Sequence, residues 1–149
     1  MGKTYKKLIA NNKKAFHNYT ITEKLETGIM LKGHEVKSLR AGNAAIKESY
    51  VRIMHNQLWL LGCHIPPYEN INSFSELSPT RNRKLLIHKK ELSKLIKLQI
   101  KGFSFIPIQL YFYGNHAKLQ IGIGKAKKLH DIRETLKKRQ VQRDLDRHQ

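Results

Sequence analysis

The side chains of this sequence that are able to do acid–base chemistry are scattered histidines and one glutamate. They are His17, His34, His64, His88 and Glu35. In principle they could supply the acid and the base of RNA cleavage. No two of them recur at a spacing that selects a catalytic pair, and histidines at strand ends more often serve structure or stack on RNA bases. A nuclease therefore stays open as an alternative, and no catalytic residue is predicted.

Metal and phosphate-loop chemistry find little support in the residue pattern. Cys63 is the only cysteine, which excludes an internal disulfide and a Cys-based zinc site. The eight histidines show no paired metal-ligand spacing, so neither a metal nor a cofactor is predicted. The run Gly122-Ile123-Gly124-Lys125 lacks the second half of either Gly-rich phosphate fingerprint. It is more typical of small residues at the exit of a strand.

Charge is the strongest compositional signal. The 149 residues carry a formal net charge of +18, with 40% hydrophobic residues, as expected for one globular domain with tails. Both the first 124 residues and the remainder are basic, which indicates a nucleic-acid-binding protein. A basic membrane-surface protein is the rival, but no long helix pairs a Trp/Phe/Leu face with a Lys face. Without a transmembrane-length apolar run or a signal-peptide pattern, we predict a cytoplasmic protein that binds no membrane.

Residues 125–149 form a charged arm, with nine Lys or Arg against four Asp or Glu. Leu129, Ile132 and Leu136 share one helical face, but Arg139 and further polar residues continue that stripe. Two apolar turns hold a long helix on a core only weakly. We predict an arm that is loose in the free protein and becomes helical against an anionic partner. A solvated C-terminal helix packed by the three apolar residues is the alternative.

Apolar periodicity predicts mostly short strands. We expect a flexible basic lead at 3–14, a strand over 19–25 that breaks at Thr27-Gly28, a second beginning at 29–31, a hairpin of 49–55 and 58–65, and strands at 85–87, 103–113 and 117–123. A surface loop is expected at 68–80 and a short helix at 89–98 that ends near Gly102. Six or seven strands with two or three short helices favour an all-β-dominated fold, a closed antiparallel barrel.

The stretch Gly33–Gly42 predicts a second short helix. Val36 and Leu39 lie three residues apart, while Glu35 falls in the first turn and Arg40 in the last, as the helix dipole favours. Gly42 can adopt the left-handed cap conformation. Because two turns are unstable alone, we expect this helix to plug the open end of the sheet.

Several stretches of the sequence resemble small protein B (SmpB), the family of tmRNA-binding (SsrA-binding) proteins of bacterial ribosome rescue. They are EVKSLRAG at 35–42, NKKAFHNY at 12–19, ESYV at 48–51, His64-Ile65 with Pro67-Tyr68, RNRKLLIHKKEL at 81–92 and GKAKKLHDIRETLKKR at 124–139. The resemblance implies an OB-like barrel over residues 1–124, followed by a tail over 125–149 that folds on the ribosome. It further implies a non-enzymatic adaptor of trans-translation.

The same resemblance assigns a tmRNA surface to the barrel. By position, contacts with the tRNA-like domain fall on His17, Glu26 and Lys118, with Leu86 in support. Charge and position add Lys13, Lys14, Arg40, Arg81, Arg83 and Lys84 as candidates. A salt bridge in the barrel wall stays open for Glu26, and a core position for Leu86. For the lysines and arginines, an ordinary solvated charge stays open.

For the tail, the resemblance implies contact with the decoding centre and the mRNA channel of the small ribosomal subunit. His130 takes the position that stacks on a decoding-centre base, followed by Asp131 and Arg133, with Ile132 in place of the family's lysine. Candidates for contacts with ribosomal RNA phosphates are Lys125, Lys127, Lys128, Lys137, Lys138 and Arg139. Alanyl-tRNA synthetase and elongation factor Tu are implied as indirect partners through charged tmRNA. A ribosomal protein is a further alternative.

Overall fold

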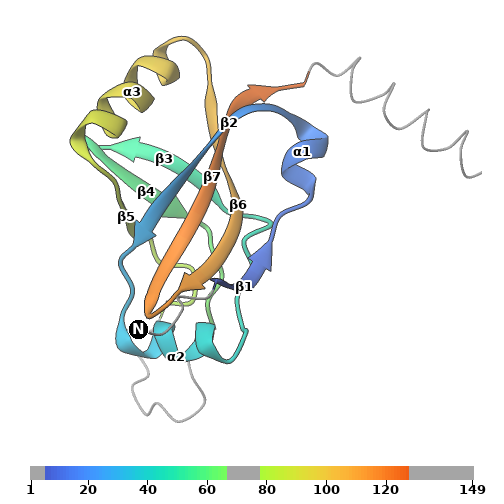
Figure 1. Ribbon diagram of the computed structural model, residues 1–149, viewed down its shortest axis with the longest axis vertical. Coiled ribbons are helices and arrows are strands. Elements are labelled where there is room, and N and C mark those ends of the chain that lie inside the picture. The colour runs from blue at the N-terminus through green and yellow to red at the C-terminus, as the bar shows by residue number, and fades with distance from the viewer. Residues whose placement is uncertain (1–5, 67–77, 128–149) are drawn as a thin grey trace, which may run out of the picture.

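The computed structural model describes residues 6–66 and 78–127, which form one seven-stranded antiparallel sheet with three helices (Figure 1). The elements are β1 (Lys6–Asn11), α1 (Lys14–Asn18), β2 (Tyr19–Ile29), α2 (Gly33–Arg40), β3 (Tyr50–Met54), β4 (Gln57–Leu61), β5 (Arg83–Leu86), α3 (Lys89–Ile100), β6 (Ser104–Tyr113) and β7 (His116–Ala126). This arrangement confirms the β-dominated class.

The sheet order is β1-β6-β7-β2-β5-β4-β3, and every described ladder is antiparallel. The order starts at β1 and ends at β3, so within the described residues the ladders form an open series. The sheet nevertheless curls, because Cα atoms of β3 come within 8 Å of those of β6. α2 lies across one end of the sheet and α3 at the other (Figure 1).

The prediction of a flexible N-terminal lead is wrong for residues 6–11. These residues form β1, an edge strand whose register pairs Lys7 with Phe112 of β6. Lysines are common on edge strands, where they discourage pairing with another chain, so the lysine content concealed the strand. The Lys6 ammonium lies 4.3 Å from the centroid of the Tyr111 ring, and it also donates a hydrogen bond to Gln109. Aromatic and amide groups of β6 therefore stabilise β1.

β2 is one continuous strand, so the predicted break at Thr27-Gly28 is also wrong. Its pairing with β7 runs from Tyr19 to Gly28, and the Thr27 hydroxyl donates to the Leu119 carbonyl at 2.9 Å. The irregularity lies earlier, between Ile21 and Glu23. Long-range pairing with β7 thus overrides the local preference of Thr-Gly for a bend.

The glycines of β7 lie against β2. A Cβ atom added at Gly124 would lie only 2.1 Å from the Thr20 carbonyl oxygen, and one at Gly122 would lie 2.9 Å from a methyl group of Ile21. At Gly124 the neighbouring atoms belong to the β2 backbone, so only glycine allows the two strands to approach this closely there. The segment is a strand and not a phosphate loop, as the sequence pattern favoured.

The predicted hairpin is confirmed as β3 and β4. Its turn residues His55 and Asn56 have φ angles of 52° and 57°, the left-handed values that a tight two-residue hairpin turn needs. Gly42 after α2 and Gly102 after α3 also have positive φ angles, 84° and 92°, consistent with the predicted helix ends.

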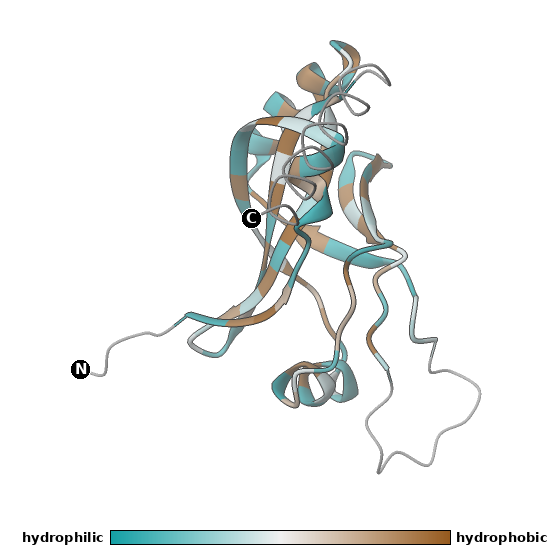
Figure 2. Cartoon of the chain, turned by 90° about the vertical axis from the view of Figure 1, so that its right-hand side faces the viewer, coloured by the Kyte–Doolittle hydropathy of each residue, from teal (hydrophilic) through white to brown (hydrophobic). Residues whose placement is uncertain are grey.

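The core lies between the curled sheet and the helices. Leu39 of α2, Leu95 of α3 and strand residues such as Leu60, Leu110 and Ile121 are fully buried in one cluster. Hydrophobic and hydrophilic segments alternate along several strands (Figure 2), as expected when one sheet face is buried. The short α2 is held by this tertiary contact, as the sequence required.

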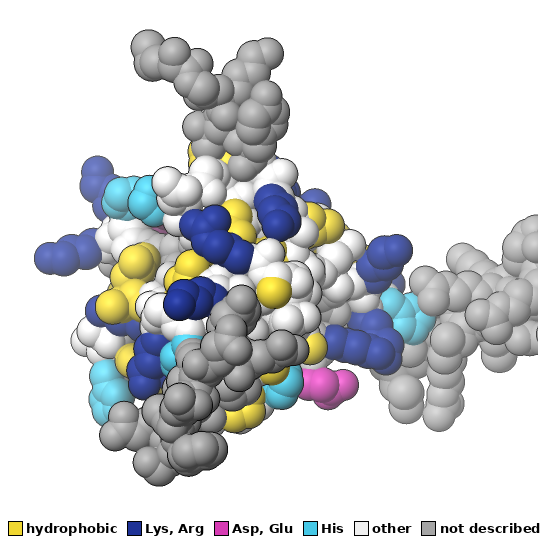
Figure 3. All heavy atoms as spheres, turned by 90° about the horizontal axis from the view of Figure 1, so that it is seen from below, with side chains coloured by type: hydrophobic (Ala, Val, Ile, Leu, Met, Phe, Trp, Pro, Cys, Tyr) yellow, Lys and Arg dark blue, Asp and Glu magenta, His cyan; other side chains and the backbone are white. Residues whose placement is uncertain are grey.

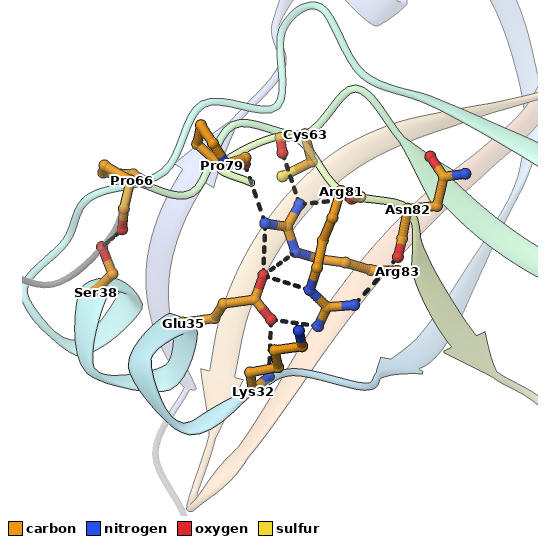
Figure 4. A network of polar contacts seen from close by, with 9 residues as sticks. All are labelled: Lys32, Glu35, Ser38, Cys63, Pro66, Pro79, Arg81, Asn82 and Arg83. Carbon is orange, nitrogen blue, oxygen red and sulfur yellow. Dashed lines mark hydrogen bonds and ion pairs between the residues drawn. The ribbon is translucent and has the colours of Figure 1, made fainter. Parts of the chain in front are cut away.

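A buried carboxylate joins α2 to the segment that enters β5 (Figure 4). Glu35 is 0% exposed and accepts hydrogen bonds from Arg81, from Arg83 at 2.7 Å and from the backbone N–H of Lys32 at 2.8 Å. Arg83 is also fully buried, and its remaining N–H groups donate to the carbonyls of Cys63, Arg81 and Pro79. The ion pair is therefore fully hydrogen-bonded, which is the condition under which a buried charge is tolerated.

Removing the charge of Glu35 should destabilise the fold strongly. Glu35→Gln leaves the Arg83 guanidinium buried without its counter-ion, so the free energy of unfolding in urea should fall by about 3–5 kcal/mol. Glu23→Gln is the matched control, because the Glu23–Lys94 pair is exposed and should be worth less than about 1 kcal/mol. Equal small losses in the two variants would contradict a structural role for the buried pair.

The contribution of Glu35 should also depend on pH. Burial raises the pKa of this carboxyl, but hydrogen bonds from Arg81, the Lys32 N–H and Arg83 outweigh burial and hold the pKa below its usual range. A carboxyl whose pKa is depressed by folding stabilises the native state above the unfolded pKa, and this stabilisation disappears as pH falls through the native pKa. The stability difference between wild type and Glu35→Gln should therefore shrink below about pH 4, near the unfolded glutamate pKa. A difference that stays constant from pH 7 to pH 2.5 would contradict this assignment.

Candidate RNA-binding surface

Three of the sequence-predicted residues meet in one cavity. Glu26, Leu86 and Lys118 all line a hollow of about 310 Å³. The strands explain this, because β2 pairs with β5 on one side and with β7 on the other. Gly28 lies opposite Leu86 in one ladder and opposite Lys118 in the other. The register of β2 thus brings residues that are far apart in sequence to one site.

A second hollow of about 310 Å³ continues the first, since both share Gly28, Leu86 and Lys118. We call the combined surface the β2–β5–β7 groove. The residues of the groove used below are Glu26, Gly28, Leu86, His88, His116 and Lys118. From the α2 end, Lys, Arg and His side chains dominate the charged groups in view, with little Asp or Glu (Figure 3). The β2–β5–β7 groove is thus a concave surface on a protein with a large positive net charge.

Leu86 gives the groove an apolar surface. Its side chain is 49% exposed, so the alternative of a core position is wrong. Gly28 beside it has no side chain, and a Cβ there would lie 3.2 Å from the Leu86 Cβ. An exposed apolar surface beside a lysine and two histidines suits RNA, because bases need apolar or ring contacts while phosphates need cations.

Glu26 is held by a buried phenol. The Tyr111 hydroxyl donates a hydrogen bond to the Glu26 carboxylate, and Tyr111 itself is only 3% exposed. Burial, reinforced by the neighbouring carboxylate, raises the pKa of Tyr111 well above its ordinary value, so the phenol stays a donor. The partner that the structure describes for Glu26 is therefore a phenol and not the cation of a salt bridge. The carboxylate keeps acceptor capacity for base or ribose donors.

His17 lies apart from Glu26 and Lys118. It lies on α1 with Lys14, after the N-cap residue Lys13 and beside the start of β2, whereas the groove lies at the end of that strand. The His17 ring is partly buried, and its Nδ1 atom is buried without a hydrogen-bond partner. The structure therefore divides the predicted tmRNA contacts between two ends of the molecule.

The predicted RNA contact of Arg83 is wrong, and that of Arg81 is restricted by a pairing within the protein. Arg83 is 0% exposed and bonded to Glu35 and three carbonyls, so it has no surface to offer to a phosphate and belongs to the fold. Arg81 is partly exposed, at 25%, but its guanidinium is also paired with Glu35. Both residues stand in a motif rich in arginine and lysine, where the sequence cannot distinguish a buried cation from an exposed one.

Lys84 and Arg40 remain at the surface. Lys84 lines a smaller hollow of about 190 Å³ that also includes Leu86, so it adjoins the groove. Arg40 is exposed at the end of α2, and its guanidinium lies 5.0 Å from the centroid of Phe112, which itself lines the groove. Both side chains can therefore extend the basic surface around the groove.

Comparison with known proteins agrees with this arrangement. The family model described as SmpB protein matches residues 9–149. The chain belongs to the SmpB family. A protein of Carboxydothermus hydrogenoformans named SsrA-binding protein is 47% identical over 142 residues, which cover 95% of each chain. One of the same name from Rickettsia bellii is 50% identical over 145 residues, covering 96% of this chain and 95% of the relative.

A solved structure gives the same result for the fold. A chain described as "tmRNA-SmpB: a journey to the center of the bacterial ribosome" superposes with a TM-score of 0.64 at 42% sequence identity. The match covers 80% of this chain and 85% of that chain. The seven-stranded sheet with its three helices is therefore the SmpB architecture.

Two groove residues escaped the sequence-based assignment to RNA. His88 was considered only for acid–base chemistry, yet it lines the groove with Leu86. The two residues lie two apart along an extended segment, and this spacing would place both on one face. His116 also lines the groove. It lies just after the turn into β7, two residues before Lys118, and the same alternation could have identified it.

The one cysteine is a buried thiol. Burial raises the pKa of Cys63 to about 11, so this thiol stays protonated at neutral pH.

In the described ranges 6–66 and 78–127, no group of three or more His, Cys, Asp or Glu is placed to hold a metal ion. Nor does any helix of those ranges have the length and apolar character needed to cross a membrane.

The structure describes only the first residues of the predicted tail. β7 runs to Ala126, and the Lys127 N–H donates to the Asn18 carbonyl at 2.9 Å, next to α1. The Lys125 ammonium lies 4.8 Å from the centroid of Phe103. The tail thus starts from a fixed position. The other tail candidates lie outside the described residues: Lys128, His130, Asp131, Arg133, Lys137, Lys138 and Arg139.

Proposed function

We propose that this chain is a non-enzymatic RNA-binding adaptor of trans-translation. It binds the tRNA-like domain of tmRNA (SsrA RNA) and delivers this RNA to the A site of stalled ribosomes. The observation that carries the proposal is the meeting of Glu26, Leu86 and Lys118 in one groove of a basic protein. Family membership and relatives named SsrA-binding protein support it.

The groove supplies two kinds of contact to the tRNA-like domain. Lys118, with Lys84 and Arg40 around it, binds phosphates, while Leu86 and the two histidines contact unstacked bases. Glu26 accepts hydrogen bonds from base or ribose donors, because Tyr111 holds its carboxylate in place. A fixed acceptor repels a misplaced phosphate, so it contributes to the selection of one RNA shape over another.

The tail provides the second part of the proposed function. The tail, residues 125–149, leaves the body from the last residues of β7 and continues as a basic segment that enters the vacant mRNA channel and folds there, with His130 at the decoding centre and the lysines and arginines along ribosomal RNA phosphates. Downstream mRNA occupies the same channel on a translating ribosome, so only stalled ribosomes admit the tail. An arm that is ordered only by RNA adds little affinity elsewhere.

The body, residues 1–124, is proposed to be an OB-like barrel closed by packing between β3 and β6. Their Cα atoms approach within 8 Å, and Val51 of β3 and Phe105 of β6 belong to the same buried cluster. Such barrels bind nucleic acid on outer faces and loops. The adaptor acts in the cytoplasm, and alanyl-tRNA synthetase and elongation factor Tu are indirect partners through charged tmRNA.

Changes in the groove should weaken binding to the isolated tRNA-like domain. Lys118→Gln removes one phosphate contact, so affinity should fall about tenfold and the slope of log K against log salt should decrease by about one. Leu86→Asp should cost more, because it places a carboxylate where a base packs. Filter binding at several salt concentrations measures both effects. Lys97→Gln, an exposed lysine farther along α3, is the control, and losses equal to this control would contradict the groove assignment.

Removal of the tail should separate the two activities. A chain truncated after Gly124 loses the arm and the last two residues of β7 but keeps the groove, because the pairs of Gly28 with Leu86 and with Lys118 lie before that point. We expect the affinity for the tRNA-like domain to stay within about threefold of wild type, since the groove contacts persist. Tagging of peptides on stalled ribosomes should be abolished in a reconstituted translation assay. If the truncated chain folds, as circular dichroism would show, and does not bind tmRNA, the proposed division of labour is wrong.

A further inference from the structure

A separate hollow lies at the other end of β2 from the groove. It has a volume of about 300 Å³ and lies between α1, the segment that enters β3 and the start of β6. We call it the α1–β3 cleft, after Lys14 on α1 and Tyr50 at the start of β3. Tyr19 lines the cleft and Gly28 lines the groove. At about 3.3 Å per residue, these two positions of β2 lie roughly 30 Å apart along the strand.

Two parts of the chain that carry the family resemblance form this cleft. Asn12, Lys14 and Asn18 come from the NKKAFHNY stretch, while Ser49 and Tyr50 come from ESYV. The groove at the other end of β2 uses none of these residues. The cleft is therefore a separate surface from the groove.

The floor of the cleft is firmly built. Asn12 is 5% exposed, and its side-chain amide donates to the Pro107 carbonyl at 2.9 Å. The Ser49 hydroxyl, also buried, donates to the Ile46 carbonyl. The Asn12 Oδ1 atom is buried in this floor without a hydrogen-bond partner, an uncommon state for a buried acceptor. The floor is therefore fixed in position, and the Asn12 Oδ1 atom is an acceptor that a ligand could use.

Two lysines, Lys14 and Lys47, line the cleft above that floor. Lys14 and Lys47 are both exposed, and the neighbouring Lys47 amine lowers the pKa of Lys14. Like charges held this close repel each other, and an anion between them turns the repulsion into attraction. Glu48 is the one carboxylate in the cleft, and it acts in the opposite direction on Lys14. Two ammonium groups against one carboxylate still favour an anionic ligand.

An exposed aromatic ring completes the cleft. Tyr50 is 49% exposed, and the Arg52 guanidinium lies 5.7 Å from its ring centroid. Aromatic rings at basic clefts provide surfaces on which unpaired bases stack, whereas bases inside a duplex are already stacked on one another. A volume of about 300 Å³ is at the small end of ligand sites, enough for one nucleotide and too small for a helix.

We propose that the α1–β3 cleft binds one unpaired nucleotide of RNA, with its phosphate between Lys14 and Lys47 and its base against Tyr50. The choice of RNA as the polymer rests on the proposed function. The nucleotide belongs either to tmRNA or to ribosomal RNA, which present the same chemistry. The site is separate from the β2–β5–β7 groove, so the protein can hold two RNA segments at once.

The test uses the full chain and a fluorescent uridine hexamer, which has no stable secondary structure. Lys14→Gln with Lys47→Gln should lower hexamer affinity about tenfold and reduce the salt slope by about 0.7, the contribution of the one single-strand phosphate held between the two lysines. Tyr50→Leu should lower affinity about fivefold and leave the salt slope unchanged, because stacking involves no counterion release. Lys97→Gln with Lys101→Gln removes the same charge from α3 and its C-cap residue, and should change affinity less than twofold.

Two further measurements keep the result decisive. Lys14→Arg with Lys47→Arg preserves the charge and should restore binding, which excludes misfolding as the cause of a loss. In NMR titrations, amide shifts caused by the hexamer should include residues 12–19 and 47–50. Loss of binding no greater than in the α3 control, or shifts confined to the groove, would overturn the proposal.

The source of the nucleotide follows from competition. Displacement of the hexamer from the cleft amides by the isolated tRNA-like domain assigns the nucleotide to tmRNA, and displacement by small ribosomal subunits assigns it to ribosomal RNA. If neither RNA displaces the hexamer, the proposal that the cleft binds a nucleotide of a natural RNA is wrong. The proposed function fails on a different result, namely a tRNA-like-domain affinity that ignores Lys118→Gln and Leu86→Asp.

Discussion

The buried Glu35 carboxylate, held between two arginines, is the interaction on which the arrangement of this protein depends. It ties the first turn of α2 to Arg83, the first residue of β5. β5 has only four residues, so an ion pair at its first residue holds the whole strand in position. Leu86 lies three residues later, at the groove. A buried charge pair therefore helps to determine where a side chain of the candidate RNA-binding groove lies.

β2 relates the two surfaces to each other. One strand of eleven residues carries the cleft at its start and the groove at its end, and β7 pairs along most of it. The close approach at Gly122 and Gly124 keeps β2 and β7 in contact through the irregularity after Ile21. Because an antiparallel pair of this length resists bending, the spacing between the two surfaces is a property of the fold and not of side-chain conformation.

Local signals predicted the elements whose structure is local. The hairpin of β3 and β4, the glycine after each of the two longer helices and the Val36–Leu39 face of α2 needed no information from distant residues. β1 and the unbroken β2 could not be predicted in this way, because β6 and β7, about a hundred positions away, determine their pairing. The same limit applied to Arg83. Its charge suggested RNA, and only the fold shows that Glu35 already pairs with it.

The net charge of +18 makes selectivity the harder problem for this protein. A surface with so many cations attracts any polyanion, so affinity alone cannot distinguish one RNA from another. Discrimination requires groups that penalise the wrong ligand. Glu26 meets this requirement, because the buried Tyr111 hydroxyl holds its carboxylate in the groove, where an approaching phosphate would be repelled and a ribose or base donor would be bound. Under the proposed function, Lys118 contributes to how tightly RNA binds, while the fixed carboxylate and the exposed leucine determine which RNA fits.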